Sequence, residues 1–287
     1  MEGNEKISPT AWMVAEGRTF SDIPFSREIF REVQKIGREG VGPDPDDVEK
    51  ITATDLAPRF EARYKIINHV VRGFGLRQVL EIASGLTPRG IEMTEDGSVD
   101  TYVEMDLPGI IKIKRMIVKI IYRELKKKKR RLFLEEGDAL DNKAVFKAAG
   151  YFDTARPIAV VSEGLLRYLN FKEKAEVARN IHDLLAVFGG AWITPDVTVR
   201  SNRHYPYEAR RNEYIERLTG IDMEKNKFES VGAAQRFFEE LGFRVEQRML
   251  GEIADSLVSP GILGLPVSDI KKRFEKSPAF VLSLSGK

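Results

Sequence analysis

The sequence contains no cysteine, only three histidines, and no apolar run near the roughly 18 residues that cross a bilayer. The missing cysteine excludes disulfides, thiolate metal sites and a cysteine nucleophile. His69, His182 and His204 are widely spaced, so we expect no metal site. A formal net charge of +2 over 287 residues argues against a nucleic-acid partner and does not indicate an oligomeric state. The polar N-terminal 18 residues lack the apolar core of a signal peptide, so we expect a cytoplasmic protein without a membrane partner.

Short apolar runs alternate with helical patterns from about Gln78 onward. The runs are QVLEIA, DTYVEM, RLFLEE, PIAVVSE, AWITPD, FRVEQRML and AFVLSLS. Such runs, bounded by turn residues, are typical of buried strands in a mostly parallel sheet. Helical patterns cover Pro108 to Lys129, Lys172 to Phe188 and Val231 to Leu241. This alternation predicts an α/β fold with a doubly wound, mostly parallel seven-stranded sheet, Rossmann-like, in which the last runs supply one antiparallel edge strand.

Two further segments lie outside the predicted sheet. Residues 1–75 contain helical patterns such as Thr54 to Phe74, and we interpret them as a helical lid or extension packed on the sheet. Residues 76–287 would then form the main domain. Within it, a segment at about 200–230 follows the fifth predicted strand and contains the aromatic and basic stretch RSNRHYPYEARRNEY. We interpret this segment as an inserted cap.

The turn after the first predicted strand, in VLEIASGLTPRG, is rich in small residues. In open α/β sheets ligands bind beyond the carboxyl ends of the strands, and Ala83, Ser84 and Gly85 allow a close backbone approach there. A tight turn without any ligand is the alternative. The spacing of Gly85 and Gly90 does not match G-x-G-x-x-G, so a nicotinamide-dependent oxidoreductase is poorly supported.

Acidic residues end the next three predicted strands. Glu104 and Asp106 end the second strand, Asp138 follows the third and Glu163 ends the fourth. A carboxylate in such a position accepts hydrogen bonds from both hydroxyls of a ribose. Asp106 also suits the start of a helix at Pro108, which is the structural alternative. Taken together, the acids predict a polar pocket for an adenosine.

Several motifs resemble those of one known family. Ala83 to Arg89 reads ASGLTPR where that family has G-A-G-L-D-T-R, and Glu104 to Pro108 with Lys114 matches its E-V-D-x-P element and following lysine. EGLLRYL at 163–169 matches E-G-x-L-x-Y-L, and Arg63 matches an upstream arginine. Over residues 8–195 the chain resembles the leucine carboxyl methyltransferase family, which includes tetracenomycin-type polyketide O-methyltransferases. Ala83 and Thr87 depart from the motif, which indicates a divergent branch.

The resemblance implies a class I enzyme that uses S-adenosyl-L-methionine (SAM) as cofactor. The implied cofactor-binding residues are Arg63, Ala83, Ser84, Gly85, Glu104, Asp106, Asp138, Ala139 and Glu163. Arg63 would pair with the SAM carboxylate, because a guanidinium suits its planar geometry. Asp106 would accept from the ribose, Asp138 and the Ala139 amide would meet the adenine, and Glu163 would lie near the cationic end.

The same resemblance implies methyl transfer to a carboxylate or hydroxyl of a small molecule or peptide terminus. Candidate acceptor-binding residues are Arg18, Tyr168, Arg200, Arg203, His204, Tyr205 and Tyr207. We assign no catalytic residue, since a carboxylate acceptor is already ionised at neutral pH; a phenol would need a base, for which His204 is the nominee.

Two alternatives remain open. One is a degenerate family member that binds a ligand without transferring a methyl group, which the altered glycine motif favours. The other is an RNA methyltransferase, suggested by KKKKRR at 126–131, although such a run also suits the exposed end of a helix.

Overall fold

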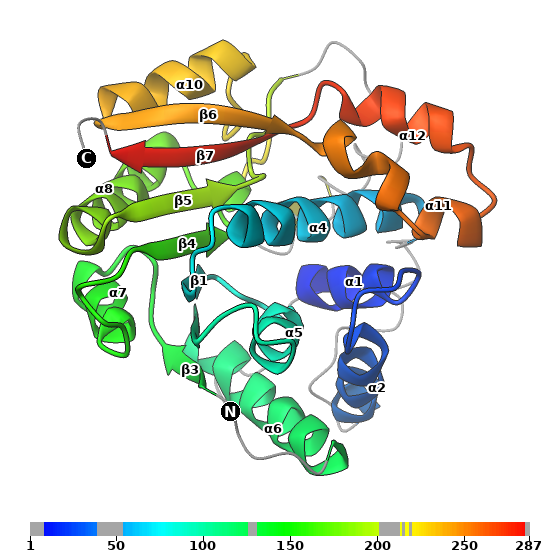
Figure 1. The fold of residues 1–287 in the computed structure, drawn as a ribbon. Coiled ribbons are helices and arrows are strands. Elements are labelled where there is room, and N and C mark those ends of the chain that lie inside the picture. Colours follow the sequence, from blue (N-terminus) through cyan, green and yellow to red (C-terminus); the bar gives the residue numbers. More distant parts are fainter. Residues whose placement is uncertain are drawn as a thin grey trace.

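A computed structural model describes residues 9–38, 54–125, 131–200, 213, 216–217 and 220–284. Its centre is one seven-stranded sheet with the order β3-β2-β1-β4-β5-β7-β6 (Figure 1). The strands are β1 Gln78–Ile82, β2 Thr101–Asp106, β3 Leu132–Glu136, β4 Ile158–Ser162, β5 Gly190–Thr194, β6 Phe243–Met249 and β7 Pro278–Leu284. All seven predicted strands are present, and the α/β prediction with a mostly parallel sheet is confirmed.

The position of the antiparallel strand differs from the expectation. β7 is antiparallel to both of its neighbours, but it lies between β5 and β6, so β6 forms the edge of the sheet. The chain between β6 and β7 makes a helical excursion, and this long connection lets the last strand return inside the edge. Strand order of this kind depends on pairing between distant segments, which short apolar runs do not encode.

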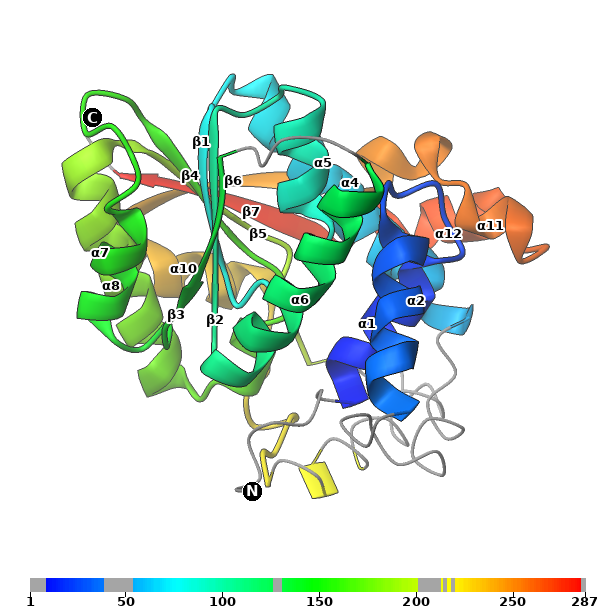
Figure 2. The same ribbon diagram turned by 90° about the horizontal axis from the view of Figure 1, so that it is seen from below.

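Helices cover both faces of the sheet in Figures 1 and 2. One face carries α4 Ala57–Gly73, α5 Arg89–Glu95 and α6 Pro108–Glu124, with α1 Pro9–Arg18 and α2 Ser26–Ile36 packed outside them. The other face carries α7 Asn142–Ala149, α8 Phe171–Phe188 and α10 Val231–Glu240. Short 3-10 helices are η2 Thr54–Leu56 and η3 Leu166–Tyr168, and the β6–β7 excursion contains η4 Leu250–Ser256, α11 Ser259–Ile262 and α12 Val267–Phe274.

Each face of the sheet has its own apolar core. The cluster under α4 to α6 contains Val79 and Val161 of the sheet, and the cluster under α7, α8 and α10 contains Leu80 and Val160. Neighbouring residues of β1 and β4 thus point to opposite faces, which explains why these strands are continuous apolar runs. The predicted helical segments are confirmed as α4, α6, α8 and α10.

Local signals set the ends of several elements. Asn170 and Glu173 form a reciprocal capping box that starts α8, and Pro108 occupies the first turn of α6, where its missing N–H costs nothing. Gly190 has φ 100°, and an added Cβ there would lie 1.9 Å from the Ile158 carbonyl oxygen. Only glycine allows β5 to pair with β4 at this point.

The sequence patterns missed the shorter helices α5 and α7 and the helices of the β6–β7 excursion, because each is too short for clear periodicity. The division into 1–75 and 76–287 stays a prediction; α4, from the first part, packs directly into the core of the sheet. Among the described helices, none has the length and apolar character that a bilayer span requires. Residues 126–130 of the basic run lie outside the described part of the chain.

Candidate active site

The carboxyl ends of the parallel strands lie level with one another. Ile82 of β1 pairs with Met105 of β2 and with Ser162 of β4, and Met105 pairs with Glu135 of β3. The segments that follow these residues therefore leave the sheet at a single edge. That edge is the place where open α/β sheets bind their ligands.

The turn after β1 adopts a strained conformation at its first residue. Ala83 has φ 54°, in the left-handed region that an L side chain occupies at a cost of about 1 kcal/mol. Gly85 has the same φ without that cost. The Ser84 N–H donates to the Met105 carbonyl oxygen over 3.2 Å, which ties the turn to β2. A turn that keeps its geometry at such a cost suits a ligand-contacting segment.

Asp106, the last residue of β2, holds this turn through its side chain. The Gly85 N–H donates to Oδ2 over 2.6 Å, and the Leu107 N–H donates to Oδ1 over 2.7 Å. Burial raises the pKa of Asp106 above its ordinary value of 3.8, and these two N–H groups oppose the rise. The carboxylate is thus fixed beside the turn, in the position expected for a group that accepts hydrogen bonds from ribose hydroxyls.

Glu163, directly after β4, is surrounded by three arginines. Arg89 Nη2 lies 2.7 Å from Oε2, Arg18 Nη2 lies 3.1 Å from Oε1, and Arg63 Nε lies 3.8 Å from Oε1. Burial alone would raise the pKa of Glu163, but the positive charges of Arg18, Arg63 and Arg89 outweigh it and lower the pKa to about 2. The carboxylate is therefore ionised at any pH at which the protein would be assayed.

Arg89 and Asp196 complete this charged cluster, and neither was among the predicted site residues. Arg89 is fully buried; it also contacts Glu81, and its Nε donates to Asn68 Oδ1 over 2.8 Å. Asp196, just after β5, lies 2.5 Å from Arg63 Nη2. Arg89 stands inside the G-L-T-P-R motif and Asp196 ends the run AWITPD, so both were visible as polar residues near strand ends.

Polar atoms without partners mark the same edge. Within the described residues, the Nε atoms of Arg18 and Arg63 and the Oγ of Ser84 are buried and have no hydrogen-bond partner. These side chains are 5%, 8% and 6% exposed, respectively. Leaving a buried polar group unpaired costs about 1–3 kcal/mol, so a native chain rarely gathers three of them in one place without a ligand. Two guanidinium N–H donors and a hydroxyl suit a ligand that carries a carboxylate.

The other predicted cofactor residues divide into two groups. Asp138 and Ala139 follow β3 at the same edge; Asp138 Oδ1 accepts from the Leu140 N–H over 2.9 Å, and the Ala139 carbonyl accepts from Asn180 over 3.0 Å. Glu104 instead lies inside the sheet, with 0% exposure, in an ion pair of 2.6 Å with Lys114 on α6. Residues two apart on a strand point to the same face of the sheet. Glu104 and Asp106 therefore share a face, but Glu104 lies inside the sheet and Asp106 lies at its carboxyl end.

The predicted acceptor residues are only partly described. Arg18 is buried in the Glu163 cluster and so lies with the predicted cofactor residues. Tyr168 lies in η3, directly after the Glu163 turn, with the Arg167 guanidinium 5.7 Å from its ring centroid. Arg200 is exposed and lies 3.8 Å from Glu229. Arg203, His204, Tyr205 and Tyr207 fall outside the described residues.

The two described histidines lie away from the edge. His69 is an exposed residue of α4, and His182 of α8 packs edge-on against Phe243 at the start of β6. Over the described ranges, no group of three or more acidic or histidine side chains is arranged to hold a metal ion.

Lys174 of α8 is fully buried near the root of the predicted cap. Its Nζ donates to the Asn226 carbonyl over 2.9 Å and to that of Leu169, and it lies 4.9 Å from the Phe171 ring centroid. The described residues offer it no carboxylate within ion-pair distance. Burial lowers the pKa of Lys174 from 10.5 to about 8, while Asp196 and Glu173 only partly oppose the change.

This lowered pKa predicts a pH-dependent stability. Between pH 8 and 10.5 the unfolded chain holds the Lys174 proton more tightly than the folded chain, so the free energy of unfolding rises with pH in that window. Relative to Lys174→Met, the wild type should gain about 2–3 kcal/mol between pH 7.5 and pH 10, measured by urea unfolding. Parallel pH dependences in the two proteins would show that Lys174 is not desolvated.

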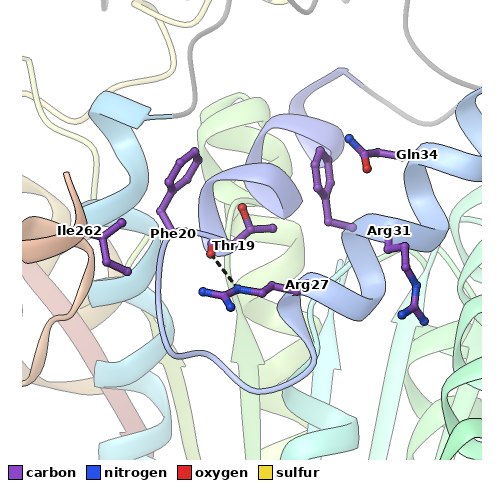
Figure 3. A pocket seen from close by; sticks show the side chains of 7 residues that line it. Thr19, Phe20, Arg27, Arg31, Gln34 and Ile262 are labelled. Atoms are coloured by element: carbon purple, nitrogen blue, oxygen red, sulfur yellow. Dashed lines mark hydrogen bonds between the residues drawn. The ribbon is translucent and has the colours of Figure 1, made fainter.

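A separate hollow of about 390 Å³ lies between α2, the turn that follows α1 and the end of α11 (Figure 3). Its lining residues are Thr19, Phe20, Arg27, Phe30, Arg31, Gln34 and Ile262. Arg27 Nε donates to the Thr19 carbonyl over 3.4 Å across it. None of the lining residues belongs to the carboxyl-end edge, so we assign the hollow no part in the candidate site.

The sequence is similar to one protein family and to proteins named as methyltransferases. A family model described as leucine carboxyl methyltransferase matches residues 24–182, more than half of the chain. A protein of Mycolicibacterium smegmatis, named as a candidate S-adenosyl-L-methionine-dependent methyltransferase, is 27% identical over 240 residues, covering 76% of each chain. A protein of Mycobacterium sp. strain KMS with the same kind of name is 30% identical over 184 residues. That alignment covers 57% of this chain and 58% of the relative, so the match spans little more than half of each.

A solved structure supports the fold along the whole chain. A DUF574 family protein from Streptomyces avermitilis superposes with a TM-score of 0.57, covering 96% of this chain and 97% of its own, at 14% sequence identity. At that identity the likeness concerns the fold alone. The sequence match, the sheet and the acid-bearing edge agree with one another, and from them we conclude that the chain belongs to the leucine carboxyl methyltransferase family, whose members use S-adenosyl-L-methionine as the methyl donor.

Proposed function

We propose that this protein is a SAM-dependent O-methyltransferase that acts on a carboxylate or hydroxyl of a small molecule or peptide terminus. The observation that carries the proposal is the meeting, at one sheet edge, of the Asp106–Gly85 clasp and the Arg18–Arg63–Glu163 cluster. SAM needs an acceptor for its ribose hydroxyls, a cation for its carboxylate and an anion for its ammonium, and the edge offers one group for each.

The proposed assignment of groups follows their charge and their free atoms. Arg63 and Arg18 each keep a buried Nε–H without a partner, so they are available to the carboxylate of the methionine part. Glu163 supplies negative charge for the ammonium, and Asp106 accepts from the ribose hydroxyls. The Ser84 hydroxyl, also without a partner, faces the same ligand. Arg18 thereby moves from the acceptor side, where the sequence suggested it, to the donor side.

The residues beyond β3 complete the proposed donor site. Asp138, which is exposed, and the Ala139 N–H would meet the adenine edge. When bound, SAM supplies a methyl group that its sulfonium has already activated for in-line displacement. The chain's own contribution is then to hold the donor rigidly, orient the acceptor and exclude water. Orientation of this kind contributes on the order of 7–11 kcal/mol to lowering a barrier.

A carboxylate acceptor fits this site better than a phenol. A carboxylic acid with a pKa of about 4 is ionised at neutral pH and needs no base, whereas a phenol with a pKa of about 10 must lose a proton. His69 and His182 lie away from the edge, so neither is placed to take that proton. The remaining histidine, His204, is the nominee if the acceptor is a hydroxyl.

Methyl transfer is tested by incubating the protein with SAM labelled in its methyl group and sets of carboxylic acids, phenols, alcohols, amines, short peptides and RNA. A methyl ester releases labelled methanol in mild alkali, whereas a methyl ether or methylamine does not. Alkali-labile product confirms a carboxylate acceptor, and alkali-stable product from phenols or alcohols confirms a hydroxyl acceptor. SAM binding without transfer to any set supports the non-catalytic alternative, and transfer only to amines or RNA contradicts the proposal.

Asp106→Ala should weaken the binding of S-adenosylhomocysteine (SAH) by about 10-fold or more. SAH is the product that remains when SAM has given up its methyl group. The substitution removes the proposed ribose acceptor and releases the Gly85 N–H, and a hydrogen bond to a charged group contributes about 1.5–3 kcal/mol. Calorimetric titration measures the change. Glu136→Ala is the matched control, because Glu136 pairs with Asp106 across β2 and β3 but is exposed and bound to Arg115. Equal affinities in the Asp106 variant and wild type would reject the ribose role.

A further inference from the structure

The side chain of Asp196 is fixed by the backbone of the turn that follows β4. It is 3% exposed, and its carboxylate accepts three successive backbone N–H groups of the turn after β4. Gly164 N lies 2.8 Å from both oxygens, and Leu165 N and Leu166 N lie 2.7 and 3.2 Å from Oδ2. Backbone donors of one turn are rigid relative to one another, so they fix the direction of this side chain.

Arg63 depends on Asp196 for its own position. Its Nη2 lies 2.5 Å from Asp196 Oδ1, and among the described residues this pair is closer than the one with Glu163. The Nε of the same guanidinium is buried without a hydrogen-bond partner and lies 3.8 Å from Glu163 Oε1. Because Asp196 is anchored by backbone and Arg63 is a long side chain with several rotatable bonds, the carboxylate orients the guanidinium and not the reverse.

The same carboxylate also sets the turn that carries Glu163. Gly164 follows Glu163 directly, and its N–H is one of the three that Asp196 accepts. Asp196, just after β5, thus ties the arginine of α4 to the glutamate after β4, although the three residues come from separate parts of the chain. The spacing between the cationic and the anionic group of the edge depends on this link.

We propose that Asp196 is a positioning residue: it fixes Arg63 with its Nε–H free of a hydrogen-bond partner and at a set spacing from Glu163, so that the pair accepts a zwitterionic amino-acid end. The proposal rests on the proposed function, in which that end is the methionine part of SAM. Holding Arg63 in place before binding removes the entropy cost of ordering it afterwards. Asp196 itself touches no part of the donor.

Two probes separate this role from a general structural one. SAH carries the adenosine, the sulfur and the amino-acid end, whereas 5′-methylthioadenosine carries the first two without the third. In Asp196→Asn, an amide keeps one oxygen for the backbone N–H groups but loses the charge that orients Arg63. We expect the dissociation constant of SAH, measured by calorimetry, to rise about 30-fold or more and that of 5′-methylthioadenosine to change less than about 3-fold.

Matched variants complete the test. Arg63→Ala should give the same pattern, and the double variant should be no weaker for SAH than Arg63→Ala, because both changes remove one interaction. Asp141→Asn, which alters an exposed cap at α7, should leave both constants unchanged. Equal weakening of both probes in Asp196→Asn would show a structural role only and overturn the inference, while the wild-type affinities would still support the proposed function. Failure of the wild type to bind either probe would overturn both.

Discussion

Arg89→Met is expected to lower the free energy of unfolding by about 3–5 kcal/mol, because it removes one partner from a buried ion-pair network. The Arg89 side chain is fully buried, and its guanidinium contacts Glu81 and Glu163. It also lies 4.5 Å from the ring centroid of Tyr64, so part of its contribution is cation–π packing. Methionine fills similar space but leaves the buried Glu81 without its cation and leaves Glu163 with only Arg18 and Arg63.

Denaturant unfolding measures this effect, and Arg77→Met is its control. Arg77 forms an ion pair of 2.7 Å with Asp100, yet both side chains are at least 39% exposed. Exposed pairs contribute about 0–1 kcal/mol, so this variant should remain close to the wild type. A loss in Arg89→Met no larger than that in Arg77→Met would contradict the account of the cluster as a buried, mutually dependent network.

Glu163→Gln is expected to weaken SAM binding by about 30-fold to 1,000-fold, which corresponds to about 2–4 kcal/mol. The substitution keeps the shape of the side chain but leaves Arg18, Arg63 and Arg89 without the carboxylate between them. A ligand with an ammonium and a sulfonium then meets uncompensated positive charge. SAM should lose more affinity than SAH, because SAH lacks the sulfonium charge.

The pH dependence of this variant gives an independent check. The pKa of Glu163 is lowered to about 2, so the wild-type carboxylate stays ionised from pH 5 to pH 8 and the ratio of the two affinities should not change in that range. Glu135→Gln serves as control, since Glu135 lies near the carboxyl end of β3, separated from β4 by β2 and β1, and bonds to Tyr151 and Lys147. A ratio that approaches one at pH 5 would mean that the Glu163 carboxyl is protonated there.

The strands and the polar residues at their carboxyl ends could be predicted from the sequence because their signals are local. A buried strand is a short apolar run whatever it pairs with, and an acid or glycine directly after it marks the strand end. Asp106 and Glu163 were found in this way, and the register places both strand ends level. The family motifs then named the methyl donor, which no periodicity could have done.

Residue partnerships could not be predicted, because they join segments far apart in the chain. Arg89 meets Glu163 across 74 positions and Arg63 meets Asp196 across 133, and both pairs exist only after the sheet has formed. Arg18 meets Glu163 across 145 positions in the same way. The Glu104–Lys114 ion pair likewise joins two elements, β2 and α6, and a role of Glu104 in cofactor binding stays a prediction.

The central claim is that the carboxyl-end edge of this sheet binds a nucleoside with an amino-acid end. Calorimetric titration of the wild-type protein with SAH tests it most directly. The account predicts saturable one-to-one binding well below millimolar concentration, with lost affinity in Arg63→Ala and Asp106→Ala. No heat of binding at millimolar SAH, from protein shown to be folded, would contradict it.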